Sequence, residues 1–113
     1  MQLTSAHRLA TYGTLAPGRA NYHHVAMLGG TWATGTVTGH LRPAGWGAAM
    51  GYPGMVPDRA GPEIAVHVLT SPDLPAHWAR LDAFEGPGYR RIVLPVRTAD
   101  SVIEASIYAL AEG

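Results

Sequence analysis

The sequence contains no cysteine and no lysine, and both absences narrow the chemistry open to it. Without cysteine there is no thiol nucleophile, no disulfide and no cysteine-bound zinc. All eight basic residues are arginines, so neither a Schiff base nor a phosphate-binding lysine of the Walker type can form. Enzymes that depend on a cysteine or a lysine are therefore excluded.

The chain also lacks an excess of charge and a long apolar run. Its formal net charge is zero, which predicts no broad attraction to nucleic acid or to an anionic membrane. No segment approaches the roughly 18 apolar residues that span a bilayer, and residues 1–8 lack the apolar segment of a signal peptide. We therefore expect a cytoplasmic protein. A length of 113 residues with 47% hydrophobic residues fits one domain, residues 1–113, with one core.

Alternating apolar residues predict a chain built mainly from strands. The clearest alternation is Ile64, Val66 and Val68, whose side chains would share one face. Pro95 has no N–H to donate, so its strand is expected at a sheet edge or at a bulge. The expected strands cover residues 7–12, 31–41, 63–70, 89–97 and 102–109, with a turn at 98–101 that joins the last two into a hairpin. Together with two helical inserts, the pattern is that of an α+β domain whose sheet can curl into a small barrel.

Two glycine- and proline-rich segments are expected to be loops. Residues 13–18 follow the first strand, and their glycines would let backbone N–H groups cradle an anion, although an ordinary turn fits the same residues. Residues 42–59 are too long for a simple turn, and loops of this length in small domains are usually functional or disordered. Trp46 and Tyr52 within this segment favour an ordered loop.

Two helices are expected between these strands and loops. Asn21 is suited to cap a short helix that runs to Leu28 and stops at the glycines that follow. A second helix is expected to begin at a cap formed by Ser71 or Asp73 and to end at Glu85.

The second helix places a carboxylate where apolar surface is expected. Leu74, Trp78 and Leu81 recur at the spacing of one helical face, and Glu85 falls on that same face at about 100° per residue. Gly86 then ends the helix. Burial and the negative end of the helix dipole both raise the pKa of a carboxyl group there, which suits a proton acceptor near neutral pH. A frayed, solvated residue at the helix end is the alternative.

Metal and serine-nucleophile motifs are missing. His23 and His24 are adjacent and would point in different directions, and the other histidines show no ligand spacing. No Gly-x-Ser-x-Gly elbow is present. We therefore expect no metal site and no cofactor.

Polar residues near the last two strands leave two interpretations open. Arg90 and Arg91 would either clamp a substrate carboxylate or lie on the surface, with Asp82 as a structural partner. Tyr108 shares a relatively polar strand face with Ser106, and this face is a candidate lining for a cavity.

Two motifs, taken in order, carry a resemblance to a known family. Residues 12–15 read Tyr-Gly-Thr-Leu after the first strand, and residues 81–86 read Leu-Asp-Ala-Phe-Glu-Gly at the helix end. The Gly-Tyr-Pro-Gly of residues 51–54 and the last strand at 104–108 extend the match over nearly the whole chain. This arrangement resembles the γ-glutamylcyclotransferase-like family, also called the avirulence-induced-gene-like family.

The resemblance implies a small mixed β-barrel with two or so flanking helices and a cavity between residues 12–15 and the end of the second helix. It implies cleavage of a γ-glutamyl amide by cyclisation of the glutamyl group to 5-oxoproline, without a metal, and it places the family's catalytic glutamate on Glu85. The expected substrate-binding residues are Tyr12, Gly13, Thr14, Leu15, Tyr52, Tyr89 and Tyr108. Since many members have no demonstrated activity, a non-catalytic small-molecule binding domain of the same fold is the alternative. A structural domain in which an arginine pairs with Glu85 also stays open.

Overall fold

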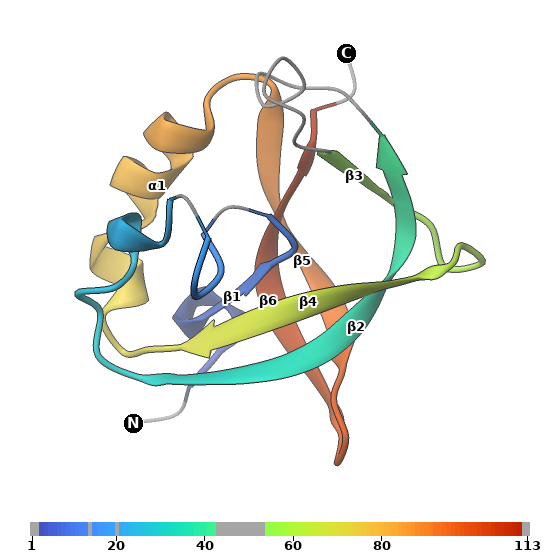
Figure 1. The fold of residues 1–113 in the computed structure, drawn as a ribbon, viewed down its shortest axis with the longest axis horizontal. Helices are drawn as coiled ribbons and strands as arrows, with labels where there is room; N and C mark the ends of the chain where they lie inside the picture. The colour runs from blue at the N-terminus through green and yellow to red at the C-terminus, as the bar shows by residue number, and fades with distance from the viewer. Residues whose placement is uncertain (1–2, 14, 20, 43–53, 112–113) are drawn as a thin grey trace.

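The strands form one sheet that curls and closes into a barrel (Figure 1). The computed structural model describes residues 3–13, 15–19, 21–42 and 54–111. The strands in these ranges are β1 (Arg8–Thr11), β2 (Thr31–Arg42), β3 (Gly54–Pro57), β4 (Glu63–Thr70), β5 (Tyr89–Arg97) and β6 (Val102–Leu110). Their order across the sheet is β3-β2-β4-β1-β6-β5, and a further pairing between β2 and β5 closes the barrel.

Five of the described strands make up the barrel, and β3 pairs with β2 as one extra strand. Strands β1 and β6 run parallel whereas the other pairs are antiparallel, so the predicted small mixed barrel of an α+β fold is confirmed. Closure rests on one register pair, Thr36 with Arg97. A Cβ on the neighbouring Gly35 would lie 2.8 Å from the Arg97 carbonyl oxygen, so glycine is what lets β5 approach β2 there. Strand β5 stands last in the strand order, and its printed pair with β2 is at Arg97, so Pro95 itself is paired with β6 alone.

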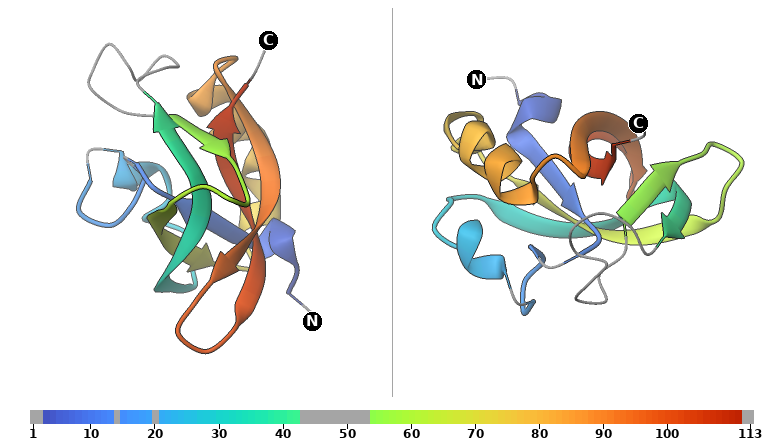
Figure 2. Two further views of the ribbon diagram at one scale, coloured as in Figure 1. Left: turned by 90° about the vertical axis from the view of Figure 1, so that its right-hand side faces the viewer. Right: turned by 90° about the horizontal axis from the view of Figure 1, so that it is seen from above.

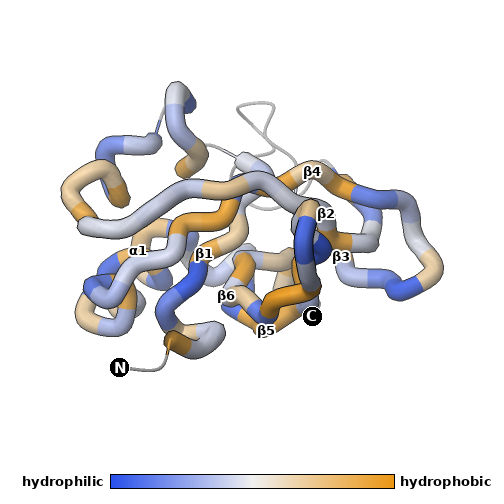
Figure 3. Tube along the Cα trace, turned by 90° about the horizontal axis from the view of Figure 1, so that it is seen from below, coloured by the Kyte–Doolittle hydropathy of each residue, from blue (hydrophilic) through white to orange (hydrophobic). Residues whose placement is uncertain are grey.

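The barrel interior is filled by apolar side chains that alternate along the strands. On β4 the side chains of Ile64, Val66 and Val68 all point inward, as their spacing predicted. Figure 3 shows hydrophobic residues concentrated on the barrel strands and a hydrophilic turn between β3 and β4. The buried members of this first cluster are Ala10, Val37, Met55, Ile64, Val66, Val68, Val96, Ala105, Ile107 and Ala109.

A second apolar cluster lies outside the barrel wall. Neighbouring residues of a strand face opposite sides, so Ala10 points into the barrel while Leu9 points outward into this second cluster. Its buried members are Leu9, Leu15, Val25, Leu69, Leu74, Trp78, Leu81 and Tyr108. Helix α1 (Trp78–Glu85) contributes two of them and lies along one side of the barrel (Figures 1 and 2). The outer cluster therefore fixes the helix that ends at Glu85.

The helix predicted from Asn21 to Leu28 is mostly wrong. Only η2 (Tyr22–His24), a 3-10 segment, forms there. The N–H groups of His24 and Val25 bond to carbonyls three residues earlier, which gives a tighter turn than an α helix. Tyrosine, histidine and valine are weak helix formers, and a nearby pair of glycines leaves no length for further turns.

The helix predicted to begin at Ser71 or Asp73 is divided into two pieces. Asp73 precedes η4 (Leu74–Ala76), a 3-10 segment, and α1 starts only at Trp78. The N–H of His77 bonds to the Leu74 carbonyl three residues back, so Leu74 does not belong to the α helix. A third 3-10 segment, η1 (Ser5–His7), precedes β1. None of the helices in the described ranges has the length and apolar character needed to cross a bilayer.

The segment predicted as one loop, residues 42–59, contains a strand. Strand β2 extends to Arg42, and β3 returns beside it with Arg42 opposite Gly54. Met55 of β3 is fully buried in the barrel cluster. Residues 43–53, which include Trp46 and Tyr52, lie outside the described part of the chain.

Candidate active site

Glu85 is the last residue of α1, and its side chain is half-buried. Trp78 and Leu81 of the same helix are buried, so the helical phase expected for Glu85 is the one observed. Gly86 has a φ of 80°, which ends the helix as predicted. Burial raises the pKa of the Glu85 carboxyl group from 4.5 to about 7, in the direction that its position predicted.

The arginine near the end of the helix, Arg91, pairs with Asp82 of α1. Arg91 Nε lies 2.9 Å from Asp82 Oδ1 and Arg91 Nη2 lies 3.3 Å from Asp82 Oδ2. Of the two interpretations left open for Arg90 and Arg91, the structural pairing with Asp82 is the one observed, and it is made by Arg91. Within the described ranges the ion pairs are Arg91–Asp82 and His40–Asp58, so no arginine there pairs with Glu85. This observation disfavours the structural domain in which an arginine neutralises Glu85.

Tyr12 connects three strands beside Glu85. Its hydroxyl donates to the Tyr108 carbonyl oxygen at 2.7 Å and accepts the Met55 N–H at 3.0 Å. Burial raises the pKa of Tyr12, and the nearby Tyr89 and Glu85 raise it further. The residue directly after β1 therefore carries a phenol that neighbours Glu85 and whose oxygen is bonded to two backbone groups.

Tyr108, the acceptor of the Tyr12 hydroxyl, also connects to helix α1 through its own side chain. Its side chain is buried, and its hydroxyl donates to Asp82 Oδ1 at 2.6 Å. Burial and the Asp82 hydrogen bond raise the pKa of Tyr108, and the charge of Glu85 adds to the effect. The carboxylate of Glu85 is thus an electrostatic neighbour of both Tyr12 and Tyr108.

The loop after β1 is described in part. The Gly13 N–H donates to the Thr11 hydroxyl at 3.3 Å, so this amide is engaged inside the protein. The Leu15 side chain is buried in the outer apolar cluster and leaves only its backbone for a ligand. Thr14 lies outside the described residues, as does Tyr52.

Tyr89 begins β5 directly after the helix end, and it packs half-buried against the outer cluster. Its effect on the pKa of Tyr12 places it in the same neighbourhood as Glu85. Six of the predicted residues thereby lie at one end of α1 or in the loop after β1: Tyr12, Gly13, Leu15, Glu85, Tyr89 and Tyr108. A groove of about 240 Å³ between β2 and β5 contains none of them.

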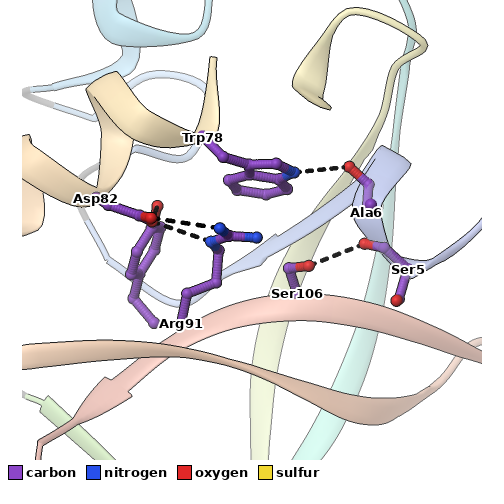
Figure 4. A network of polar contacts seen from close by, with 7 residues as sticks. Ser5, Ala6, Trp78, Asp82, Arg91 and Ser106 are labelled. Carbon is purple, nitrogen blue, oxygen red and sulfur yellow. Dashed lines mark hydrogen bonds and ion pairs between the residues drawn. The ribbon is translucent and has the colours of Figure 1, made fainter. Parts of the chain in front are cut away.

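The polar strand face predicted to line a cavity is covered in the structure. Ser106 is buried and donates its hydroxyl proton to the Ser5 carbonyl oxygen at 2.9 Å (Figure 4). Tyr108 on the same face is turned to Asp82. Sequence reasoning missed the role of Asp82 as the acceptor for Tyr108. The signal available was its position three residues before Glu85, on an adjoining part of the helix surface.

Replacing Tyr12 by phenylalanine is expected to lower the free energy of unfolding by about 1–3 kcal/mol. The change removes the acceptor of the Met55 N–H and the donor to the Tyr108 carbonyl, both at buried residues. Urea denaturation of the two proteins measures the difference. A matched control is Tyr22→Phe, because the Tyr22 hydroxyl has no hydrogen bond to another described residue. Equal losses in both variants would contradict the assigned role of the Tyr12 hydroxyl.

These features define a class of protein: a small mixed barrel with a flanking helix that ends in a half-buried glutamate beside two tyrosines. The sequence matches the family described as gamma-glutamyl cyclotransferase, AIG2-like, over residues 9–113. The chain belongs to this family, and the resemblance identified from its motifs is confirmed. No significant match is found among curated proteins.

Solved structures share the fold. YkqA from Bacillus subtilis is 27% identical to this chain, with a TM-score of 0.70. The match covers 91% of this chain and 35% of YkqA, so this chain spans about a third of the length of YkqA. The uropathogenic E. coli-specific protein c4763 is 23% identical with a TM-score of 0.67, covering 99% and 82% of the two chains. An AIG2-like protein from Mus musculus is 21% identical with a TM-score of 0.69, covering 92% and 76%. At these identities the last two establish similarity of fold alone.

Proposed function

We propose that the protein cleaves a γ-glutamyl amide by cyclising the glutamyl group to 5-oxoproline, with Glu85 as the proton-transferring residue. The observation that carries the proposal is a half-buried carboxyl group with a pKa of about 7, without an arginine partner among the described residues. Family membership supports the reaction class. No cofactor is required for this reaction.

The chemistry asks for one group that both accepts and returns a proton. The substrate's α-amine is mostly protonated at neutral pH, and Glu85 as a carboxylate removes that proton. The freed nitrogen attacks the γ-carbonyl carbon and gives up a second proton as the lactam forms. The bond from this carbon to the leaving nitrogen breaks as Glu85 gives its proton to that nitrogen, and with the second proton the amine leaves in its ammonium form. Such general acid–base assistance typically contributes about 10²- to 10⁴-fold. Because the attack is intramolecular, holding the glutamyl chain folded supplies a further part of the rate.

Substrate binding is assigned to the residues around this carboxyl group. Tyr12, Gly13, Thr14, Leu15, Tyr52, Tyr89 and Tyr108 are the proposed binding residues. In this proposal the backbone amides of Thr14 and Leu15 bind the substrate α-carboxylate or the developing oxyanion, because the Gly13 amide already bonds to Thr11. Tyr12 and Tyr108 would contribute their rings, since both hydroxyls donate to protein acceptors.

The test is a screen of γ-glutamyl amides for release of 5-oxoproline together with the free amine. Product formation by the wild-type protein and its loss in Glu85→Gln support the proposal. Binding of 5-oxoproline or of a γ-glutamyl amide without turnover would instead indicate a non-catalytic binding domain. The absence of both binding and turnover across the panel would overturn the assignment.

Turnover is expected to decline as pH falls through about 7. Only the ionised form of Glu85 accepts the proton, and its raised pKa places the change from carboxylate to carboxylic acid near pH 7. Below that pH, kcat should fall about tenfold per unit, and above it kcat should level off. A pH–rate profile with a flat acid limb down to pH 5 would show that the base is a group of ordinary carboxyl pKa.

A further inference from the structure

We propose that Tyr108 and Arg91 are positioning residues that act on Glu85 through Asp82. Tyr108, Arg91 and Asp82 form a clamp that holds the last turns of α1 against the β5–β6 hairpin. The clamp sets how deeply the Glu85 carboxylate is buried. The catalytic consequence of this inference rests on the function proposed for Glu85. The geometric part, in which the clamp controls the exposure of Glu85, stands independently of turnover.

The clamp is built on one rung of the hairpin. Arg91 of β5 and Tyr108 of β6 are directly opposite register partners, so their side chains leave the same face of the sheet. Both donate to one carboxylate: Tyr108 at 2.6 Å, and Arg91 at 2.9 and 3.3 Å through two nitrogens. These hydrogen bonds outweigh the effect of partial burial and hold the pKa of Asp82 below its usual value. The carboxylate of Asp82 is therefore a firm point of attachment for the helix.

A second attachment lies one turn earlier on the helix. The Arg91 guanidinium carbon lies 4.4 Å from the centre of the Trp78 ring, and Figure 4 shows Arg91 beside both Trp78 and Asp82. The Trp78 indole N–H donates to the Ala6 carbonyl oxygen at 2.9 Å, and the centroids of the Trp78 and Tyr108 rings lie 6.4 Å apart in a T-shaped arrangement. The same rung of the hairpin thus holds two successive turns of α1.

The helix needs such attachment because it is short. It has eight residues, and isolated helices below about 12 residues are marginal in water. Its position must therefore come from tertiary contacts. Asp82 and Glu85 are three residues apart and neighbours on the helix surface, so a shift at Asp82 is transmitted directly to Glu85.

Tyr108 is the member of the clamp that is also bonded to Tyr12, whose pKa the charge of Glu85 raises. Its backbone carbonyl accepts the Tyr12 hydroxyl, and the Tyr12 oxygen accepts the Met55 N–H. The charged and titratable groups around Glu85 are then Asp82 on its own helix, Tyr12 directly after β1, Tyr89 and Arg91 on β5, and Tyr108 on β6. Releasing the clamp should let water reach the carboxylate, and desolvation is the cause of its raised pKa.

The test is a pH titration of the Glu85 carboxyl group in Tyr108→Phe, monitored by NMR of protein labelled with ¹³C at the glutamate side chains. Comparison with Glu85→Gln assigns the signal. We expect the pKa of Glu85 to fall by about one unit or more from its value of about 7. The acid limb of the pH–rate profile should move down with it, and kcat should fall about tenfold or more while KM changes less.

Two further variants keep the result decisive. Tyr22→Phe is the matched control, which removes a tyrosine hydroxyl at the same outer cluster, and it should leave the pKa of Glu85 unchanged. Arg91→Met removes a positive charge, which by charge alone would raise the pKa of Glu85, so a fall in this variant reports exposure of the carboxylate. A lower thermal midpoint with an unchanged pKa of Glu85 in Tyr108→Phe and Arg91→Met would overturn the proposal. If no γ-glutamyl amide is turned over, the function fails, yet the NMR titration still decides the positioning role.

Discussion

Replacing Glu85 by glutamine is expected to lower turnover at least about 100-fold. Glutamine keeps the shape and the hydrogen-bonding atoms of the side chain but takes no proton at neutral pH. If Glu85 is the general base, the lost assistance is of the order that positioned proton transfer supplies, about 10²- to 10⁴-fold. Substrate affinity should change much less than rate, because the proposed contacts of the loop with the glutamyl group remain. Steady-state turnover and the binding of 5-oxoproline measure the two quantities separately.

A glutamate elsewhere on the barrel provides the control. Glu104 is exposed on β6, and its backbone carbonyl rather than its side chain takes part in a hydrogen bond. Glu104→Gln removes the same charge from the protein and should retain the wild-type rate. Unchanged turnover in Glu85→Gln would remove Glu85 from the mechanism.

The stability of Glu85→Gln should depend on pH in a defined direction. The pKa of Glu85 is higher in the folded protein, at about 7, than its ordinary value of 4.5. Protonation of Glu85 therefore favours the folded state below about pH 4.5, and this stabilisation is lost as pH rises through about 7. Glutamine carries no charge at any pH, so the variant should gain in thermal midpoint relative to the wild type at pH 8 compared with pH 5. The opposite trend would show that the ionised carboxylate is stabilised by partners.

Replacing Leu81 by alanine is expected to cost about 2–5 kcal/mol in the free energy of unfolding. Leu81 is fully buried in the outer cluster, and its truncation removes apolar contacts and leaves a cavity between α1 and the barrel wall. Domains are typically stable by about 5–15 kcal/mol, so the loss is a large part of the total. Urea denaturation measures it as a lower midpoint.

The same substitution at an exposed leucine provides a control for the loss of a leucine side chain without the loss of buried contacts. Leu41 on β2 is 49% exposed, and Leu41→Ala should cost less than about 1 kcal/mol. A loss at Leu81 no larger than at Leu41 would mean that the outer cluster does not hold α1 to the barrel. The function proposed for Glu85 would then need a different support.

Local patterns in the sequence were sufficient for several elements. The alternation of Ile64, Val66 and Val68 predicted β4, because a strand with one buried face has a period of two that is readable without any partner. The end of α1 was readable as well, since Gly86 adopts a positive φ that other residues avoid. Glu85 was placed on the buried side of the helix for the same reason: its phase follows from the helical repeat.

Other elements were not readable from local patterns. Strand β3 has only four residues, Gly54–Pro57, and both glycine and proline are disfavoured in strands. It forms because its backbone pairs with β2. Leu74 matched the helical spacing to Trp78, yet the chain makes a 3-10 turn between them. Spacing alone does not distinguish a continuous helix from two short pieces.

The sequence by itself determined the family, the strand pattern of the barrel and the chemical type of the candidate base, because each depends on residue identity and short-range periodicity. Only the tertiary structure decided which groups surround that base. The hydrogen bond from Tyr108 to Asp82 joins residues 26 apart, and the one from Tyr12 to Tyr108 joins residues 96 apart. The first depends on how α1 packs on the outer cluster, and the second on the parallel pairing of β1 with β6. Such contacts follow from how distant strands align, which no local repeat in the chain encodes.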